Sequence, residues 1–363
     1  MRIVFTGGGT GGHIYPAIAI AREISERRPQ TKIQFIIGNR DIEKKIVSDA
    51  GYVYNILPVT GLPRKLSPAI ITFIWKLKIS IMKSMLILKK FKPSLVMATG
   101  GYVSGPPVIA AWIMRIPVCM QEQNSYPGIA TKKLARFSKI IFLGFNDARL
   151  FLGKKVKTVV TGNPVRKELL DSISARSSDE FGLNPDLKTV LVIGGSQGAS
   201  RINDSMSEIV KDLANNDIQV IWQTGEGEFE KWEKLSEYSP GKIIIVSYLG
   251  KIGAAYSAAD VVVSRAGAMA VAEIAVCGLP AIFIPLASAA EHHQEYNAAS
   301  LVKSGAAIMI TENELTSEKL KGEIIGLLNS PEKTEEMKKK LTDFGRIDAA
   351  GVIAETLIES YGN

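Results

Sequence analysis

The chain has 363 residues but only two cysteines and three histidines. Cys119 and Cys277 lie in apolar runs in different halves, so the sequence excludes a disulfide framework and offers no zinc-type spacing. Glycines begin at Gly7, where a signal peptide would need its apolar stretch, so we expect no signal peptide and a cytoplasmic protein. With 46% apolar and 22% charged residues, the composition is typical of a globular protein with room for two domains.

Acidic residues are absent from positions 64–92, which hold eight lysines and arginines. Elsewhere the basic residues balance the 36 acidic ones, so the net charge of +8 originates in this one segment. Nucleic-acid binders usually set their basic residues among polar and aromatic side chains. This segment is aliphatic instead, which favours a membrane surface and argues against nucleic acid as a partner.

The same segment predicts a helix over about 68–91 with two apolar stripes. One stripe, suited to a core, has three- and four-residue spacing and comprises Ile70, Ile74, Leu77, Ile81, Met85 and Leu88. A second stripe runs between two edges of lysines and comprises Ile71, Trp75, Ile79, Met82 and Leu86. No uncharged run reaches the roughly 18–20 residues of a spanning helix. A buried helix with snorkelling lysines is one interpretation; the lysine edges favour the other, in which the second stripe enters a lipid interface.

Apolar runs alternate with helical periodicity along the chain, which predicts α/β domains with doubly wound parallel sheets. A strand over 1–6, a glycine loop and a helix open the first half, and the same pattern begins again at 189. Gly162, Asn163 and Pro164 interrupt both periodicities. We therefore predict a first domain over 1–162 and a second over 163–344, with a C-terminal helix within 345–363 that packs back on the first domain.

The glycine loop after the first strand ends in a histidine. Gly7, Gly9 and Gly12 satisfy the G-x-G-x-x-G pattern of a dinucleotide site. The acidic residue expected at the end of the second strand, over 31–37, is missing. A dinucleotide site and a purely structural turn stay open as alternatives, but neither explains His13, a titratable imidazole at the mouth of a turn whose N–H groups can face an anion.

Two segments of the second half have the residues of a nucleotide site. The loop over 194–198 offers backbone amides and the Ser196 hydroxyl to a phosphate. Gly267 and Ala268 open a helix whose first turn faces a phosphate, and Glu273, about one and a half turns on, can accept both hydroxyls of a ribose. An ordinary turn and a solvated glutamate are the alternatives, although the apolar neighbours of Glu273 disfavour the second.

A cluster of neutral polar side chains begins a later helix. His293, Gln294 and Asn297 are donors and acceptors of the kind that read sugar hydroxyls. A metal site of Glu291, His292 and His293 is the alternative. Their consecutive spacing does not place them on one helical face, so we expect no metal.

Seven segments together resemble the MurG family, the N-acetylglucosaminyltransferases of peptidoglycan synthesis. In chain order they are residues 8–13, 100–102, 122–124, 162–166, 194–199, 265–273 and 293–297. The resemblance covers almost the whole chain. It implies a GT-B fold, in which two Rossmann-like domains face across a cleft. It also implies a metal-independent, inverting hexosyltransferase that moves GlcNAc from UDP-GlcNAc to the muramoyl 4-hydroxyl of undecaprenyl-linked lipid I, forming lipid II; UDP-GlcNAc is a substrate, and no cofactor is implied.

The resemblance also implies roles for individual residues. By resemblance, Glu273 binds the ribose, Gln294 with His293 binds the sugar, and the backbone at Leu249 contacts uracil. The residues implied to bind the diphosphate are Ser196, Arg166, Ala268, Met269 and Ala270. Those implied to contact the GlcNAc and the acceptor are Asn124, Thr10, Gly11 and Gly12. His13 is then the candidate catalytic base, or a ligand of the acceptor diphosphate. The family usually has the sequence His-Glu-Gln-Asn at the positions of residues 121–124, where this chain has Gln121 in place of the histidine. A role of that histidine therefore does not carry over to this chain.

The family implies a peripheral protein on the cytoplasmic face of the cell membrane, bound to an anionic inner leaflet and acting in cell wall biogenesis, cell shape and cell division. Other cell-wall synthesis proteins are expected partners. Three alternatives remain at this point. They are a related GT-B transferase acting on diacylglycerol, a UDP-GlcNAc epimerase, and a non-catalytic membrane-bound sensor of nucleotide sugars.

Overall fold

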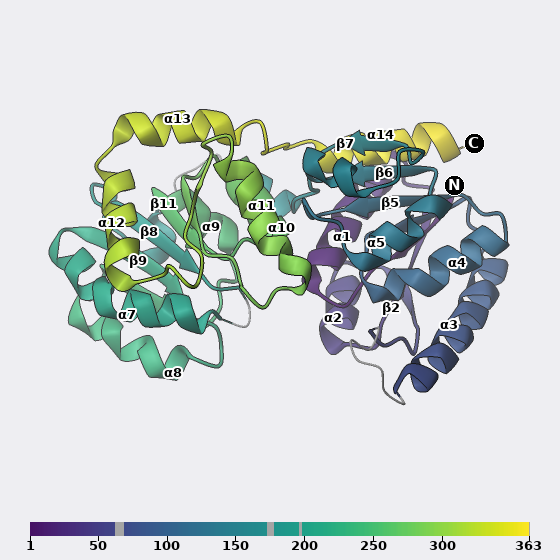
Figure 1. Ribbon diagram of the computed structural model, residues 1–363, viewed down its shortest axis with the longest axis horizontal. Helices are drawn as coiled ribbons and strands as arrows, with labels where there is room; N and C mark the ends of the chain where they lie inside the picture. The colour runs from purple at the N-terminus through teal and green to yellow at the C-terminus, as the bar shows by residue number, and fades with distance from the viewer. Residues whose placement is uncertain (62–68, 173–177, 196–197, 363) are drawn as a thin grey trace. The chain divides into compact units, whose positions relative to one another are not determined.

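The computed structural model describes residues 1–61, 69–172, 178–195 and 198–362. The chain divides into two compact units, one of Met1–Arg166 with Ile347–Asn363 and one of Lys167–Arg346. Each unit has a parallel sheet with helices on both faces (Figure 1). The predicted α/β class is confirmed, and two Rossmann-like units in one chain match the expected GT-B fold.

The sheet of the first unit has seven parallel strands among the described residues, in the order β3-β2-β1-β4-β5-β6-β7. The strands are β1 (Arg2–Thr6), β2 (Lys32–Ile37), β3 (Val53–Ile56), β4 (Leu95–Ala98), β5 (Val118–Glu122), β6 (Ile140–Leu143) and β7 (Thr158–Val160). The helices are α1 (Gly11–Arg27), α2 (Asp41–Asp49), α3 (Ala69–Phe91), α4 (Gly105–Ile113), α5 (Ile129–Leu134) and α14 (Ala349–Tyr361).

Alternation along β1 divides the core of this unit into two layers. Ile3 and Phe5 pack against α1, α2 and α14, where Ile353 and Leu357 complete the layer. Val4 points to the opposite face and packs with residues of α3 and α4. Successive side chains of a strand point to opposite faces, so a buried parallel strand is apolar on both. The C-terminal helix α14 is thus part of the first unit's core, where sequence analysis expected it to pack (Figure 1).

The sheet of the second unit has six parallel strands in the described part of the chain, in the order β10-β9-β8-β11-β12-β13. The strands are β8 (Lys188–Ile193), β9 (Ile218–Gln223), β10 (Ile243–Val246), β11 (Val261–Ser264), β12 (Ala281–Phe283) and β13 (Ile308–Met309). The helices are α6 (Lys167–Ser172), α7 (Ser200–Asn215), α8 (Phe229–Trp232), α9 (Ile252–Ala258), α10 (Ala268–Val276), α11 (His293–Val302), α12 (Ser317–Leu328) and α13 (Pro331–Leu341).

The strand order reverses at one place in each sheet, between β1 and β4 and between β8 and β11. In doubly wound sheets, ligands bind outside the carboxyl ends of the strands at such a reversal. The described segments that follow these strands are residues 7–10 and 99–101 in the first unit, and 194–195 and 265–267 in the second. Topology therefore selects the segments that sequence analysis had singled out.

The first unit extends to Arg166, beyond the boundary that the sequence predicted after Gly162. Asn163 explains the difference, because its side chain is buried in the first unit. Its Nδ2 donates to the Gln123 carbonyl at 2.9 Å, and its Oδ1 accepts from Gln121 Nε2 at 2.9 Å. The second unit likewise continues to Arg346 rather than ending at 344.

Helix α3 leaves most of its second apolar stripe in solvent. Ile71, Trp75, Met82 and Leu86 are 74%, 65%, 66% and 67% exposed, whereas Ile79 is half-buried. The first stripe faces the core only in part, because full burial along this helix begins at Ser80, and the earlier Ile74 is 46% exposed. No helix among the described residues is long and apolar enough to cross a membrane.

Candidate active site

His13 lies in the first turn of α1, half-buried, at the end of the first glycine loop. Its Nδ1 is 2.9 Å from Gln123 Oε1, and its backbone carbonyl accepts from Thr99 Oγ1 at 2.6 Å. The turn after β4 presses on the ring. A Cβ atom added to Gly100 would lie 3.1 Å from His13 Nδ1, and one added to Gly101 would collide with the Gly8 carbonyl. Both glycines have positive φ, so the turn needs residues without a side chain.

The glycine loop is held from behind by Glu43, a residue that sequence analysis did not single out. Its Oε1 accepts from Gly9 N at 2.6 Å, and Arg40 Nη1 donates to the Gly9 carbonyl at 2.5 Å. Glu43 is fully buried on α2. A dinucleotide site needs an acidic residue at the end of β2 to bind a ribose. Here the nearby buried acid is Glu43 on the following helix α2, and it binds the backbone of the glycine loop instead. An acidic residue in the first turn of an otherwise amphipathic helix was the available signal.

Asn124 is oriented by a second buried carboxylate. Its backbone N and its Nδ2 lie 3.0 and 3.1 Å from Glu122 Oε1, and Gly128 N lies 3.3 Å from Glu122 Oε2. Glu122 ends β5 and is 2% exposed. The next residue, Gln123, contacts His13, so the loops after β1, β4 and β5 meet at one edge of the sheet.

Arg166 lies on the same side of the first unit. Its guanidinium carbon is 5.0 Å from the centre of the Tyr15 ring, which belongs to the first turns of α1. The predicted boundary after Gly162 assigned Arg166 to the second domain, with the diphosphate as its expected ligand. The structure assigns it to the unit of His13, where it supplies positive charge beside the start of α1. Thr10 is exposed and Gly11 and Gly12 are half-buried at this start.

In the second unit, α10 combines a helix N-terminus with a buried carboxylate. Gly267 caps the helix, and Ala268, Met269 and Ala270 form its first turn, whose N–H groups lack acceptors within the helix. Glu273 lies on this helix, 7% exposed, with its Oε2 3.4 Å from the Tyr256 hydroxyl on α9. Amides suited to a phosphate and a carboxylate suited to a ribose thus occur on one short helix.

Gln294 and His293 begin α11 in fixed orientations. Gln294 Oε1 accepts from Leu286 N at 3.0 Å, and its amide nitrogen has no hydrogen bond among the described residues. His293 Nδ1 lies 2.7 Å from the Ala290 carbonyl, which can only accept, so Nδ1 carries the proton. Both residues therefore have a polar atom left for a ligand.

Asn297 corrects one expectation. It is fully buried, and its Nδ2 donates to the Ala266 carbonyl at 3.1 Å, so it holds the loop before α10 instead of presenting its amide to a sugar. Glu291 and His292 have φ of 53° and 52°, a left-handed conformation that costs about 1–3 kcal/mol per residue and is common at ligand sites. Within the described residues, no group of His, Cys, Asp and Glu is arranged to hold a metal ion.

The second glycine loop is held by Gln223. Its Nε2 donates to the Gly195 carbonyl at 2.8 Å, and its Oε1 accepts from Leu249 N at 3.1 Å. The backbone at Leu249 is predicted to lie near uracil; its N–H already donates to Gln223, so its carbonyl is the group that it can offer to a base. Ser196 lies outside the described residues.

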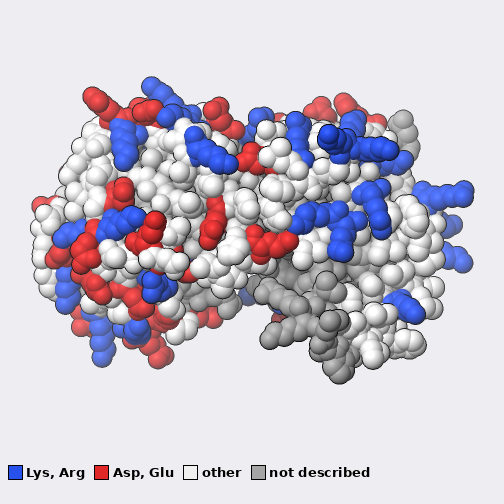
Figure 2. Space-filling model, viewed as in Figure 1, with Lys and Arg blue, Asp and Glu red and all other residues white. Residues whose placement is uncertain are grey.

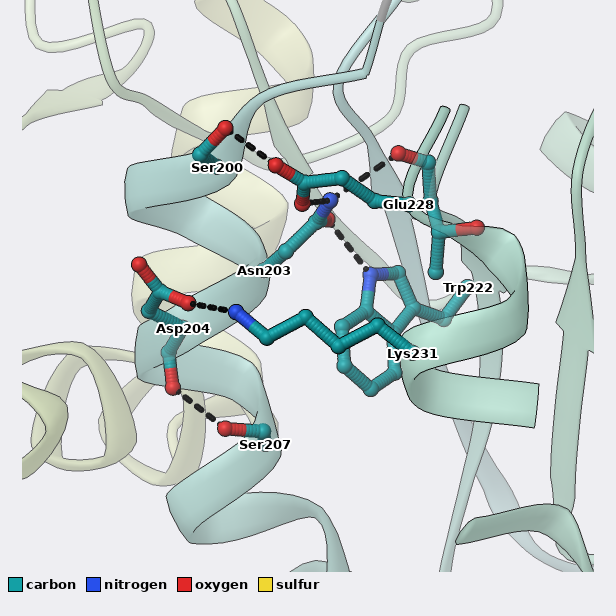
Figure 3. Close-up of polar contacts among 8 residues, drawn as sticks. Ser200, Asn203, Asp204, Ser207, Trp222, Glu228 and Lys231 are labelled. Carbon is teal, nitrogen blue, oxygen red and sulfur yellow. Dashed lines mark hydrogen bonds and ion pairs between the residues drawn. The ribbon is translucent and has the colours of Figure 1, made fainter. Parts of the chain in front are cut away.

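The N-terminus of α7 already carries a carboxylate. Glu228 accepts from Ser200 Oγ and from Asn203 Nδ2, the latter at 2.6 Å, and Trp222 Nε1 donates to Asn203 Oδ1 at 3.0 Å (Figure 3). Burial raises the pKa of Glu228, but the hydrogen bonds from Ser200 and Asn203 and the charge of Lys231 together lower it by more, so the pKa lies below its ordinary value. A negative charge at this helix start leaves α10 as the better place for a phosphate.

Arg265 is used inside the second unit. Its Nη2 is 2.6 Å from Glu312 Oε1, its Nη1 donates to the Ile284 carbonyl at 3.0 Å, and the two side chains of the ion pair are only 12% and 14% exposed. Burial raises the pKa of Glu312, but the Ala287 N–H and Arg265 lower it more, with a net pKa below the usual value. Arg265 therefore positions the strand ends rather than a substrate.

Comparisons with known proteins agree with this geometry. The model of the glycosyltransferase family 28 N-terminal domain matches residues 3–143, and that of the C-terminal domain matches residues 189–352. A UDP-N-acetylglucosamine–N-acetylmuramyl-(pentapeptide) pyrophosphoryl-undecaprenol N-acetylglucosamine transferase of Desulfitobacterium hafniense strain Y51 is 41% identical, with 99% of each chain covered. The protein of the same name in Desulforamulus reducens is 40% identical, with 96% of each chain covered.

Solved structures show the same relation. The crystal structure of Acinetobacter baumannii MurG superposes with a TM-score of 0.78 at 25% identity, with 99% of each chain covered. A UDP-GlcNAc 2-epimerase from Neisseria meningitidis, bound to UDP-GlcNAc, has a TM-score of 0.71 at 18% identity, covering 99% of this chain and 100% of its own. The second likeness shows the fold alone. Given identities of about 40% along nearly its whole length, the chain belongs to the MurG family of glycosyltransferases, within glycosyltransferase family 28.

Proposed function

We propose that this chain moves GlcNAc from UDP-GlcNAc to the muramoyl 4-hydroxyl of undecaprenyl-linked lipid I, with inversion at the anomeric carbon, to form lipid II for the cell wall. The observation that carries the proposal is the identity of about 40%, over nearly the full chain, to relatives named for this transfer. The arrangement of polar groups in each unit supports it.

The second unit has the groups that a nucleotide-sugar donor needs. Glu273 accepts the ribose hydroxyls, the amides of the first turn of α10 bind the diphosphate, and Gln294 donates its amide nitrogen to the sugar. A helix N-terminus stabilises the charge that develops on departing UDP. With Arg166 as a further cation for a diphosphate, the reaction needs no metal ion in this proposal.

The first unit has the groups that activate the acceptor. An inverting transfer needs a base that removes the proton of the attacking hydroxyl. His13 takes this role through Nε2, because Nδ1 is occupied by Gln123. Thr10, Gly11, Gly12 and Asn124 surround the same edge of the sheet and hydrogen-bond the sugars.

The test is an assay of the purified chain with radiolabelled UDP-GlcNAc and one of three acceptors: a lipid I analogue, diacylglycerol or none. We expect transfer to the lipid I analogue alone, with a β-linkage, and undiminished turnover in EDTA. Transfer to diacylglycerol, or conversion of UDP-GlcNAc without acceptor, overturns the proposed function. Loss of turnover in EDTA that Mg²⁺ restores overturns the metal-independent mechanism.

We further propose that the protein lies peripherally on an anionic inner leaflet through α3. The second stripe of this helix has four exposed apolar side chains, Ile71, Trp75, Met82 and Leu86, and one half-buried side chain, Ile79. The neighbouring α4 adds Trp112 and Ile113, which are 56% and 48% exposed and which sequence analysis did not single out. Among the charged side chains on the face of this unit that Figure 2 shows, most are Lys and Arg. Apolar area edged by positive charge is typical of interfacial helices.

Vesicle flotation tests this membrane proposal. Trp75→Glu with Met82→Glu should abolish binding to phosphatidylglycerol vesicles while leaving the melting temperature unchanged, since both side chains are exposed. Tyr238→Glu, at a 48% exposed position in the second unit, is the matched control and should still float. Undiminished flotation of the double variant would exclude α3 as the lipid-binding face.

A further inference from the structure

Three buried amide side chains lie beneath His13 and have no part in the substrate contacts proposed above. Gln121, Gln123 and Asn163 are 0%, 2% and 4% exposed. Gln121 lies in β5 and Gln123 directly follows the strand, and their side-chain amides contact each other. Buried amides need every donor and acceptor placed correctly, because an unmatched pair is costly in a low-dielectric interior.

The backbone fixes the orientation of Gln123. Its Nε2 donates to the Thr99 carbonyl at 2.8 Å. A carbonyl can only accept, so the amide nitrogen must face Thr99 and Oε1 must face His13. The alternative orientation would direct Oε1 at the Thr99 carbonyl, with two acceptors in contact and no proton between them.

Gln121 and Asn163 enforce the same orientation from the other side. Gln121 Oε1 accepts from Gln123 Nε2, and Gln121 Nε2 donates to Asn163 Oδ1 at 2.9 Å. Asn163 Nδ2 in turn donates to the Gln123 carbonyl at 2.9 Å. This amide network starts at one backbone carbonyl and ends at another, so none of its members can flip alone without bringing two like groups together.

We propose that Gln123, oriented by this amide network, is a positioning residue that fixes His13 in the tautomer with the proton on Nδ1. The 2.9 Å contact joins His13 Nδ1 to an oxygen that can only accept, so Nδ1 must donate. A neutral imidazole has one proton, and Nε2 therefore keeps its lone pair. In terms of the proposed function, on which this inference rests, that lone pair takes the proton of the acceptor hydroxyl.

Gln121 joins the network although it has no titratable group. A neutral imidazole at this position would also accept with one nitrogen and donate with the other, so Gln121→His is a conservative variant of the network. Gln123→Met is the disruptive variant, because methionine is close in length but neither accepts from Nδ1 nor donates to Thr99.

The test is ¹⁵N NMR of the full chain labelled at histidine, in which His13 is identified by the resonances lost in His13→Ala. We expect wild-type His13 to be protonated at Nδ1 and bare at Nε2. In Gln123→Met the equilibrium should move towards the Nε2–H form, which the neutral side chain of a solvated histidine prefers. Turnover should fall about tenfold or more with KM for UDP-GlcNAc unchanged. Gln121→His should keep both the tautomer and the turnover.

Wild-type His13 protonated at Nε2 overturns the inference by itself, even if Gln123→Met does not fold. A folded Gln123→Met that retains the Nδ1–H form overturns it as well. Turnover undiminished in His13→Ala, with the wild-type tautomer as expected, would refute the role of His13 as base and leave the tautomer assignment intact. The two failures are thereby distinguishable.

Discussion

The two glycine-rich segments that begin at Gly7 and Gly194 follow equivalent strands in sheets of equivalent order, yet their surroundings differ. In the first unit, buried side chains converge on a titratable group, His13, and Glu43 takes the N–H of Gly9. In the second, Gln223 and Glu228 bind the Gly195 carbonyl and the start of α7, and the groups proposed to bind the nucleotide lie on α10, which follows the neighbouring strand β11. We therefore propose that the same topology serves acid–base chemistry in one unit and nucleotide binding in the other.

The largest effect should come from removing the titratable group itself. His13→Ala should lower turnover by about 10²–10⁴-fold, the range for loss of a general base, with the affinity for UDP unchanged. His292→Ala is the control, since this side chain is 64% exposed and outside the proposed contacts. If turnover in the lipid I assay decreases by less than about tenfold, His13 is not the general base.

The complementary change in the second unit should affect binding. Glu273→Ala should weaken UDP binding by about 1.5–3 kcal/mol, the loss expected for hydrogen bonds to a charged group. It should leave the tautomer of His13 unchanged. Calorimetric titration with UDP measures it, and a thermal melt controls for the lost contact with Tyr256. If UDP binds a folded Glu273→Ala variant as tightly as wild type, the ribose site lies elsewhere.

Glu43 tests whether the first loop depends on its buried carboxylate. Glu43→Ala should lower the free energy of unfolding of the first unit by about 2 kcal/mol, because Gly9 N is left buried and unpaired. Asp41→Ala is the matched control in the same helix turn, with a side chain that is 98% exposed. Equal urea midpoints for the two variants would contradict this role.

The smallest effect concerns Glu312, which holds Arg265 in the second unit. Its pKa is lower in the folded state than in the unfolded state, so its stabilising contribution is complete above the ordinary pKa of glutamate, about 4.3, and is lost as the pH falls through the folded value. Glu312→Gln should therefore lower stability at pH 7 and flatten its decline on acidification. Urea midpoints between pH 7 and 3 measure this, with Glu335→Gln as an exposed control in the same unit. An unchanged decline would show that the pair carries no such linkage.

Sequence reasoning located the elements because their signals are local. The three- and four-residue spacing of the second stripe indicated a separate face of α3, on which Trp75 and Met82 are exposed, and apolar runs ending in glycine predicted β1 and β8. It missed Glu43 and Gln123, whose partners Gly9 and His13 are 34 and 110 positions away. Such pairs follow from the crossover connections of a parallel sheet, which no short-range period records.

By itself, the sequence determined the two α/β units, the apolar stripe on α3, the family and the loops that matter, since periodicity, glycine positions and motif order are written along the chain. Only the tertiary structure decided how particular polar residues are used. In the folded protein, Arg265 forms an ion pair with Glu312, Asn297 donates a hydrogen bond to the Ala266 carbonyl, and Gln123 contacts His13. The reason is physical: a buried polar group must find a partner, and the fold decides which partners are within reach.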